Sequence, residues 1–188
     1  MSDPLELAAR LAREYLAALP ARAVAPAPKA VEALEQLRTP LPEGPTDPAA
    51  VLASLDAVGS PATMASAGGR FFGFVTGAAL PVAVGASWLA TAWDQNAALS
   101  AMSPIAVALE RVALEWLREL FGLPEGSAGA LVTGGTMASF TALAAARRAV
   151  LLGAGWNVDD DGLFGAPPIT VVVGDEVHVA VIKALGLL

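Results

Sequence analysis

A glycine turn between two apolar segments constrains the fold of this chain more than any other feature. Thr133-Gly134-Gly135-Thr136 follows the apolar run 129–132, which predicts a short buried strand, and precedes an alanine-rich helix predicted from about Met137 to Leu152. After a polar link, the continuous β-branched run 169–173 predicts a strand that is covered on both faces. Strand, helix and strand in this order predict a right-handed crossover, and therefore the start of an α/β parallel sheet.

The N-terminal residues 1–60 predict a helical arm and not a core. Apolar residues recur at helical spacing from Leu5 to Leu19 and stop at a proline. Short amphipathic helices are predicted over residues 28–38 and 47–58, the second with an aspartate N-cap and a proline at its first position. The prolines between these segments indicate turns.

Two longer helices are predicted between the arm and the glycine turn. An apolar helix begins at Pro81 and ends near Trp93. The next helix opens at Ser103-Pro104, again a cap followed by a proline, and ends at Phe121, just before a glycine.

The composition predicts that much apolar surface needs to be covered. The chain is 55% hydrophobic and 15% charged, which excludes a disordered chain and indicates a membrane protein, an obligate oligomer or a fragment. A membrane span needs about 20 consecutive apolar residues, and the candidate from Ala78 to Trp93 is interrupted by Pro81 and Gly85. The N-terminus is amphipathic and unlike a secretory signal, so we predict a cytoplasmic protein without a membrane partner.

Several other classes of site are excluded by residue content. The chain has no cysteine and a single histidine, which rules out thiolate sites and a histidine metal cluster. The acidic run Asp159–Asp161 predicts a solvated loop, so no metal site is expected. A net charge of −7 without a Lys/Arg cluster argues against a nucleic-acid partner.

The glycine turn has the chemistry of an anion site. At a helix N-terminus, free backbone N–H groups and the positive end of the helix dipole favour a phosphate, and the Thr136 hydroxyl adds a hydrogen-bond donor. The spacing matches neither the nucleoside-triphosphate loop nor the dinucleotide fingerprint. From the residues alone, a tight turn that binds nothing is an equal alternative.

His178 is a second candidate for the same site. It follows the second predicted strand, at the sheet edge where open α/β sheets bind their ligands. The alternative is an ordinary polar residue near the start of a helix. The position of His178 beside the edge that carries the glycine turn favours a common crevice.

The order of these segments resembles the group II pyridoxal-phosphate-dependent decarboxylases, which include aromatic amino-acid and glutamate decarboxylase-like enzymes. The resemblance runs from Arg70 to Leu188 and is carried by four runs: RFFGFVTGAALPVAVGASWLATAWDQN, SPIAVALERVALEWLRELFGLP, GALVTGGTMASFTALAAARRAVL and VVVGDEVHVAVIKALGLL. It implies the transferase-like type I fold, an α/β fold, with an N-terminal arm over 1–60 and the first part of the cofactor-binding large domain over 61–188.

The resemblance also implies site residues, a cofactor and a homodimer. The family's phosphate loop, which binds pyridoxal 5'-phosphate, corresponds to Gly134, Gly135 and Thr136. His178 corresponds to the histidine that stacks on the pyridine ring beside the substrate carboxylate that is lost. The substrate pocket, at the dimer interface in many relatives, corresponds to Phe72, Phe74 and Val75.

Two groups that the family needs have no counterpart in this chain, namely the aspartate that pairs with the pyridinium nitrogen and the Schiff-base lysine. The chain's lysines, Lys29 and Lys183, do not lie in the family's lysine motif, and the sequence stops inside the apolar run 184–188. We therefore expect the truncated N-terminal part of an amino-acid decarboxylase, a carboxy-lyase, which is inactive by itself. Another type I lyase or transaminase, and a truncated interaction module without catalysis, remain alternatives.

Overall fold

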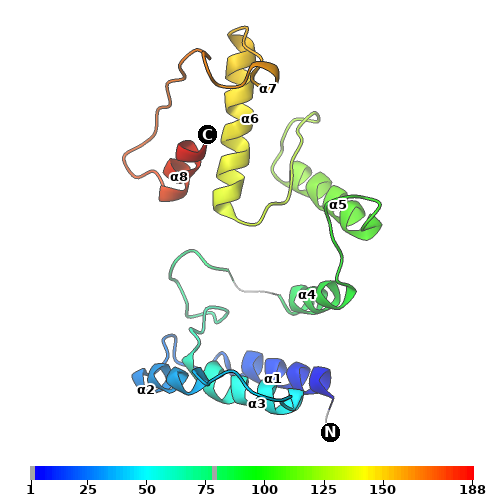
Figure 1. Ribbon diagram of the computed structural model, residues 1–188, viewed down its shortest axis with the longest axis vertical. Helices are drawn as coiled ribbons and strands as arrows, with labels where there is room; N and C mark the ends of the chain where they lie inside the picture. The colour runs from blue at the N-terminus through cyan, green and yellow to red at the C-terminus, as the bar shows by residue number, and fades with distance from the viewer. Residues whose placement is uncertain (1–2, 78–79) are drawn as a thin grey trace. The chain divides into compact units, whose positions relative to one another are not determined.

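The computed structural model describes residues 3–77 and 80–188, and helices are the regular elements within them (Figure 1). Ala78, where the rejected membrane-span candidate begins, lies outside the described residues. The elements in chain order are α1 Pro4–Ala18, α2 Pro28–Glu32, the 3-10 helix η1 Ala33–Leu37, α3 Pro48–Gly59, the 3-10 helix η2 Ser60–Ala62, α4 Pro81–Trp93, α5 Pro104–Leu120, α6 Gly135–Gly153, α7 Val158–Asp161 and α8 Val179–Leu187.

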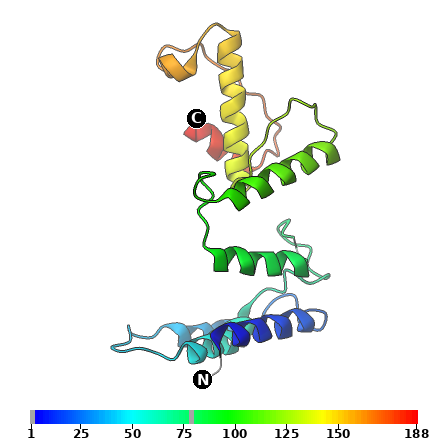
Figure 2. The same cartoon turned by 90° about the vertical axis from the view of Figure 1, so that its right-hand side faces the viewer.

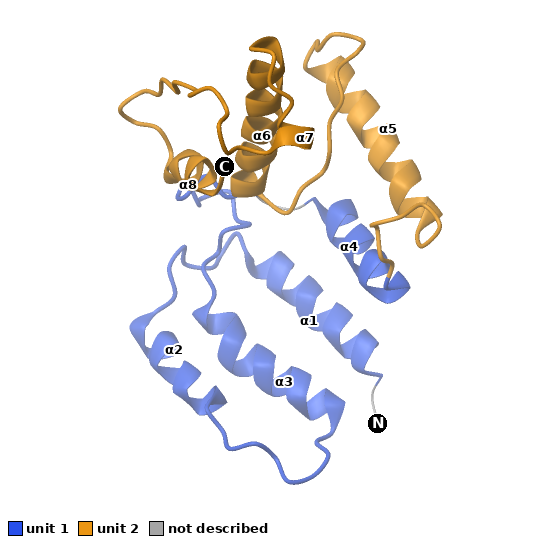
Figure 3. Ribbon diagram, turned by 45° about the horizontal axis from the view of Figure 1, so that its top comes forward, with its two compact units in different colours: residues 1–94 blue, residues 95–188 orange. Residues whose placement is uncertain are grey.

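The chain divides into two compact units, Met1–Asp94 and Gln95–Leu188 (Figure 3). The first contains the helices up to α4, and the second contains α5 to α8. The predicted boundary between arm and large domain at residue 60 falls inside the first unit and stays a prediction.

Side-chain caps fix where the predicted helices begin. The Asp47 carboxylate accepts a hydrogen bond from the backbone N–H of Ala50 at 3.3 Å, and a proline occupies the first position of α3. The fully buried Ser103 caps α5 in the same way, accepting from Ala106 N at 3.3 Å. Gly122, with φ of +61°, follows the last turn of α5, as a helix-ending glycine does. The predicted starts of these helices are confirmed.

In the first unit, α1 lies against α3 (Figure 2). The Tyr15 hydroxyl lies 3.0 Å from Thr63 Oγ1, and the Arg22 guanidinium lies 4.6 Å from the centroid of the Tyr15 ring. Arg70 donates to the Pro20 carbonyl at 3.0 Å and also to the Arg22 carbonyl. These contacts hold the residue that precedes the phenylalanine-rich segment against the turn after α1.

The prediction of two strands is wrong for the part of the chain that the structure describes. Residues 129–132 and 169–173 have no regular secondary structure in the part of the chain that the structure describes, and Val172 is 90% exposed. A strand needs a neighbour to pair its N–H and C=O groups, and a parallel pair needs both strands side by side. Neither segment has such a neighbour here, so the expected α/β sheet is absent from the described residues.

In the second unit, α8 packs along α6 (Figure 1). Ala184 is fully buried, and Ala180 and Leu151 are nearly so. Because Ala180 and Ala184 are one turn apart, they form a stripe of small side chains that lets the helices approach closely. At the far end, the Arg147 guanidinium on α6 donates to the Leu188 carbonyl, which fixes the register of the two helices.

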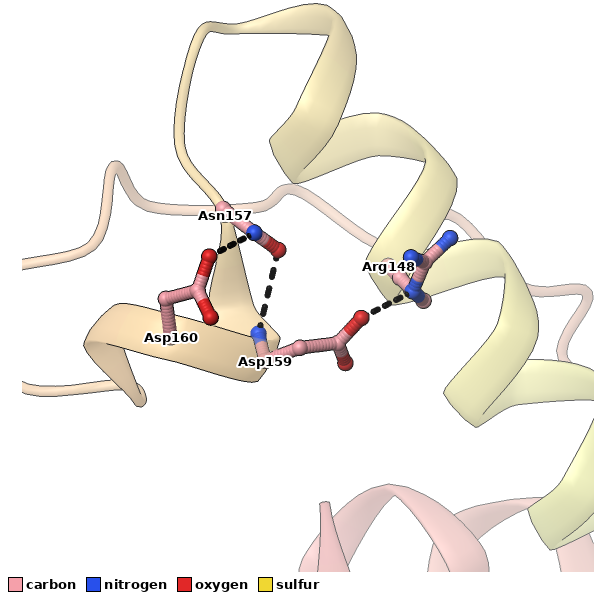
Figure 4. Close-up of polar contacts among 4 residues, drawn as sticks. All are labelled: Arg148, Asn157, Asp159 and Asp160. Carbon is pink, nitrogen blue, oxygen red and sulfur yellow. Dashed lines mark hydrogen bonds and ion pairs between the residues drawn. The ribbon is translucent and has the colours of Figure 1, made fainter.

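The acidic run that was predicted as a solvated loop forms most of α7 (Figure 4). Asn157 caps this short helix by accepting from Asp159 N at 3.3 Å, and its amide donates to the Asp160 carboxylate. Asp159 also pairs with Arg148 on α6 at 2.5 Å. Three carboxylates in a first turn are favourable near the positive helix end, so capping and charge together form a helix here.

Much apolar surface remains exposed in both units. The described hydrophobic residues that are buried are Leu19, Ala65, Leu151, Ala180 and Ala184, whereas Trp116 is 70% exposed. This exposure agrees with the composition, which predicts a chain whose apolar surface is larger than its own fold can bury. Across the described ranges, no helix has the length and apolar character needed to cross a bilayer.

Enlarging the α8 stripe tests the packing of the second unit. Ala184→Leu adds volume at a fully buried site, so we expect the free energy of unfolding to fall by about 1–3 kcal/mol. The control Lys183→Leu places a leucine at the neighbouring exposed position and should change the free energy of unfolding little. Thermal unfolding, followed by far-ultraviolet circular dichroism, gives the free energy of unfolding of both variants. Equal effects of the two substitutions would contradict the close packing of α8 on α6.

Candidate functional site

The glycine turn lies at the N-terminus of α6, as the sequence predicts. Gly134 is the N-cap residue with φ of +157°, and Gly135 is the first residue of the helix. A Cβ atom built on either glycine meets no heavy atom within 4 Å. The space beside the turn is therefore open to a ligand, and the backbone can approach that ligand closely.

The N-terminus of α6 keeps its hydrogen-bond donors free of a side-chain cap. No side chain among the described residues caps α6, whereas Asp47, Ser103 and His178 cap α3, α5 and α8. The first N–H groups of a helix have no partner within the helix, and the dipole places partial positive charge there. This arrangement favours an anion.

A hollow of about 390 Å³ brings this turn and the single histidine together. Its walls come from the first residues of α6 and of α8, and they are Gly135, Thr136, Ser139, His178, Ala180 and Val181. The packing of α8 along α6 places the two helix N-termini at the same end (Figure 1). Thr136 and His178, far apart in the sequence, therefore line one cavity.

The imidazole ring of His178 bonds to the backbone at the start of α8. Its Nδ1 accepts a hydrogen bond from Ala180 N at 3.1 Å, so the imidazole is the N-cap of this helix. The bond requires Nδ1 to be unprotonated and leaves Nε2 as the ring nitrogen outside the cap. The histidine thus has a structural task and also lines the hollow.

Ser139 also lines the hollow and was not predicted from the sequence. It follows Thr136 by three residues on α6, and residues at this spacing share a helix face. Helical spacing from Thr136 is the signal that would have identified it. Its hydroxyl adds a second side-chain donor beside the turn.

The predicted pocket residues Phe72, Phe74 and Val75 lie in the first unit, whereas the hollow lies in the second. Their exposed fractions are 92%, 90% and 103%. Phe74 and Val75 have φ of +56° and +54°, in the left-handed region that is strained for bulky and β-branched residues. Their role in a substrate pocket stays a prediction.

Neither lysine belongs to the hollow. Lys29 lies on α2, and Lys183 is an exposed residue of α8 that is not among the lining residues. Over residues 3–77 and 80–188, no group of three or more histidine, cysteine, aspartate or glutamate side chains could hold a metal ion. What the hollow offers is an uncapped helix N-terminus, two hydroxyls and an imidazole.

Comparison with known proteins gives these groups a chemical context. Residues 33–186 match the family described as "Pyridoxal-dependent decarboxylase conserved domain". A stretch of 119 residues is 31% identical to an aromatic-L-amino-acid decarboxylase of Bacillus atrophaeus, and it covers 63% of this chain but 22% of that protein. The matched part thus spans about a fifth of the relative's length. Because the family match extends over most of the sequence, the chain belongs to the pyridoxal-dependent decarboxylase family.

Proposed function

We propose that this chain supplies part of the cofactor site of a pyridoxal 5'-phosphate-dependent decarboxylase that acts on an aromatic L-amino acid. The observation that carries the proposal is the hollow where the N-termini of α6 and α8 meet, lined by Thr136, Ser139 and His178. An anionic group and an aromatic ring are the two parts of this cofactor, and the hollow offers partners for both. The apolar character of Phe72 and Phe74 agrees with an aromatic substrate.

The phosphate would be held by the turn before α6. Gly134 and Gly135 leave room for close approach, the first N–H groups of α6 donate, and the Thr136 hydroxyl adds a donor. Ser139 lies within the same lining and would support the phosphate from the next turn. These donors are neutral, so the helix dipole supplies the favourable charge.

The ring would lie against His178. Because Nδ1 is used by the helix cap, the imidazole is oriented before any ligand arrives, which lowers the cost of ordering it on binding. We assign to it stacking on the pyridine ring and contact with the carboxylate that leaves. Bound pyridoxal phosphate supplies the electron sink for the electron pair left when carbon dioxide departs.

The remaining parts of the site would come from elsewhere in a longer protein. Lys29 and Lys183 are outside the hollow, so we propose that this chain is inactive by itself. Segments 129–132 and 169–173 would become strands of the type I α/β fold once neighbouring strands pair with the N–H and C=O groups other than the Leu131 N–H, which donates to Glu110. We further propose a homodimer, in which Phe72, Phe74 and Val75 line the substrate pocket.

Cofactor binding tests this function directly. Pyridoxal phosphate is titrated into the 188-residue chain and into the protein encoded by the complete reading frame, followed by borohydride reduction and peptide mapping. We expect reduction to fix the cofactor to one lysine of the longer protein, and to neither Lys29 nor Lys183. If neither protein binds the cofactor, the decarboxylase proposal is wrong and the interaction module takes its place.

Removing the turn hydroxyl tests the phosphate assignment. In the protein from the complete reading frame, Thr136→Ala should raise the Kd for pyridoxal phosphate about tenfold, because a hydrogen bond to a charged group is lost. The Kd for pyridoxal, which lacks the phosphate, should stay unchanged. Thr141→Ala, at an exposed position further along α6, is the matched control. A similar loss with both ligands would contradict a phosphate contact at Thr136.

Replacing the imidazole while keeping the cap separates the two tasks of His178. Asparagine is a good N-cap, so His178→Asn should leave the melting temperature near that of the parent, whereas His178→Ala should cost about 1 kcal/mol of stability. Both variants should lower kcat for an aromatic L-amino acid at least about 100-fold, because the ring is lost from the reacting centre. Full activity of the asparagine variant would show that His178 serves only as a cap.

A further inference from the structure

The segment that leads into the glycine turn is tied to α5 by one carboxylate. Glu110, half-buried in the middle of α5, accepts a hydrogen bond from the backbone N–H of Leu131 at 2.9 Å. Leu131 lies in the segment that was predicted to be a strand, two residues before the turn begins. A backbone N–H that donates to an ionised carboxylate makes a stronger bond than one that donates to a neutral acceptor.

Close packing supports the same contact. A Cβ built on Gly129 would lie 3.1 Å from Leu114 Cδ2, so the backbone of this segment passes close to α5, and a larger residue there would require the Leu114 side chain to shift. Ser127 N also donates to the Pro124 carbonyl at 2.9 Å, which turns the chain back toward the helix. The segment therefore runs close to α5, and the Glu110–Leu131 bond is the hydrogen bond that ties it there.

We propose that Glu110 is a positioning residue for the phosphate-binding turn, an inference that rests on the proposed function. The downstream end of the turn is fixed by α6, where Ala138 N donates to the Gly134 carbonyl at 3.0 Å. Gly134 and Gly135 have no side chain that packs against a neighbour, and even a Cβ built on either would meet no heavy atom within 4 Å, so the upstream end of the turn needs its own anchor. Glu110 supplies it through Leu131.

Glu110 acts through the backbone and not on the ligand. It is not among the residues that line the hollow at the α6 N-terminus. A carboxylate in that hollow would repel a phosphate, whereas at Leu131 its charge is used by an N–H group. Its loss should therefore weaken the part of the affinity that comes from the phosphate and leave ring binding unchanged.

The test compares two substitutions with a matched control in the protein from the complete reading frame. Glu110→Ala removes the acceptor, Glu110→Gln keeps an acceptor oxygen without the charge, and Glu115→Ala removes an exposed glutamate later on the same helix. Hydrogen exchange at the Leu131 amide reports the anchor itself. The Kd values for pyridoxal phosphate and for pyridoxal report its consequence, and circular dichroism checks the fold.

We expect Glu110→Ala to speed exchange at Leu131 and to raise the Kd for pyridoxal phosphate about tenfold, with the Kd for pyridoxal unchanged. Glu110→Gln should keep the exchange rate at Leu131 and the Kd for pyridoxal phosphate close to the parent's values. Glu115→Ala should change neither quantity. If Glu110→Ala keeps the parent's preference for the phosphorylated ligand, the inference is overturned while the proposed function stands. If the parent itself shows no such preference, the proposed function fails, and the inference fails with it.

Discussion

The site depends on the packing of α8 along α6. Ala180 and Ala184 are small enough to let the two helices touch, and Arg147 fixes their register through the Leu188 carbonyl. Because of that register, the N-termini of α6 and α8 both lie at the same hollow. The positive ends of the two helix dipoles are therefore next to it. Without this contact between α6 and α8, Thr136 and His178 would not line the same hollow.

The site also shows how an acidic chain can favour an anion. The net charge is −7, yet the hollow is lined by glycine, hydroxyl and imidazole groups and contains no carboxylate among its lining residues. Backbone N–H groups at a helix N-terminus act over short range, where the distant surface charges are screened. The local arrangement of donors, and not the overall charge, therefore decides which ligand the hollow suits.

Helices and strands differ in how far the sequence predicts them. The starts of α3 and α5 follow from Asp47-Pro48 and Ser103-Pro104, because caps and prolines act within one turn. The segments 129–132 and 169–173 carry strand-forming residues, but a strand also requires a paired neighbour. In the described residues, segment 129–132 is held by the hydrogen bond from Leu131 N to Glu110. No local sequence pattern predicts this contact.

The sequence by itself determined where α3 and α5 begin, that the glycine turn leads into a helix, and the family to which the chain belongs. It also named His178, although its task as the N-cap of α8 and the presence of Ser139 beside it became clear only in three dimensions. Local spacing and capping set the first group of features, because they involve neighbouring residues. The tertiary structure alone decided that Thr136 and His178 share a hollow, since that depends on the contact between two helices distant in the sequence.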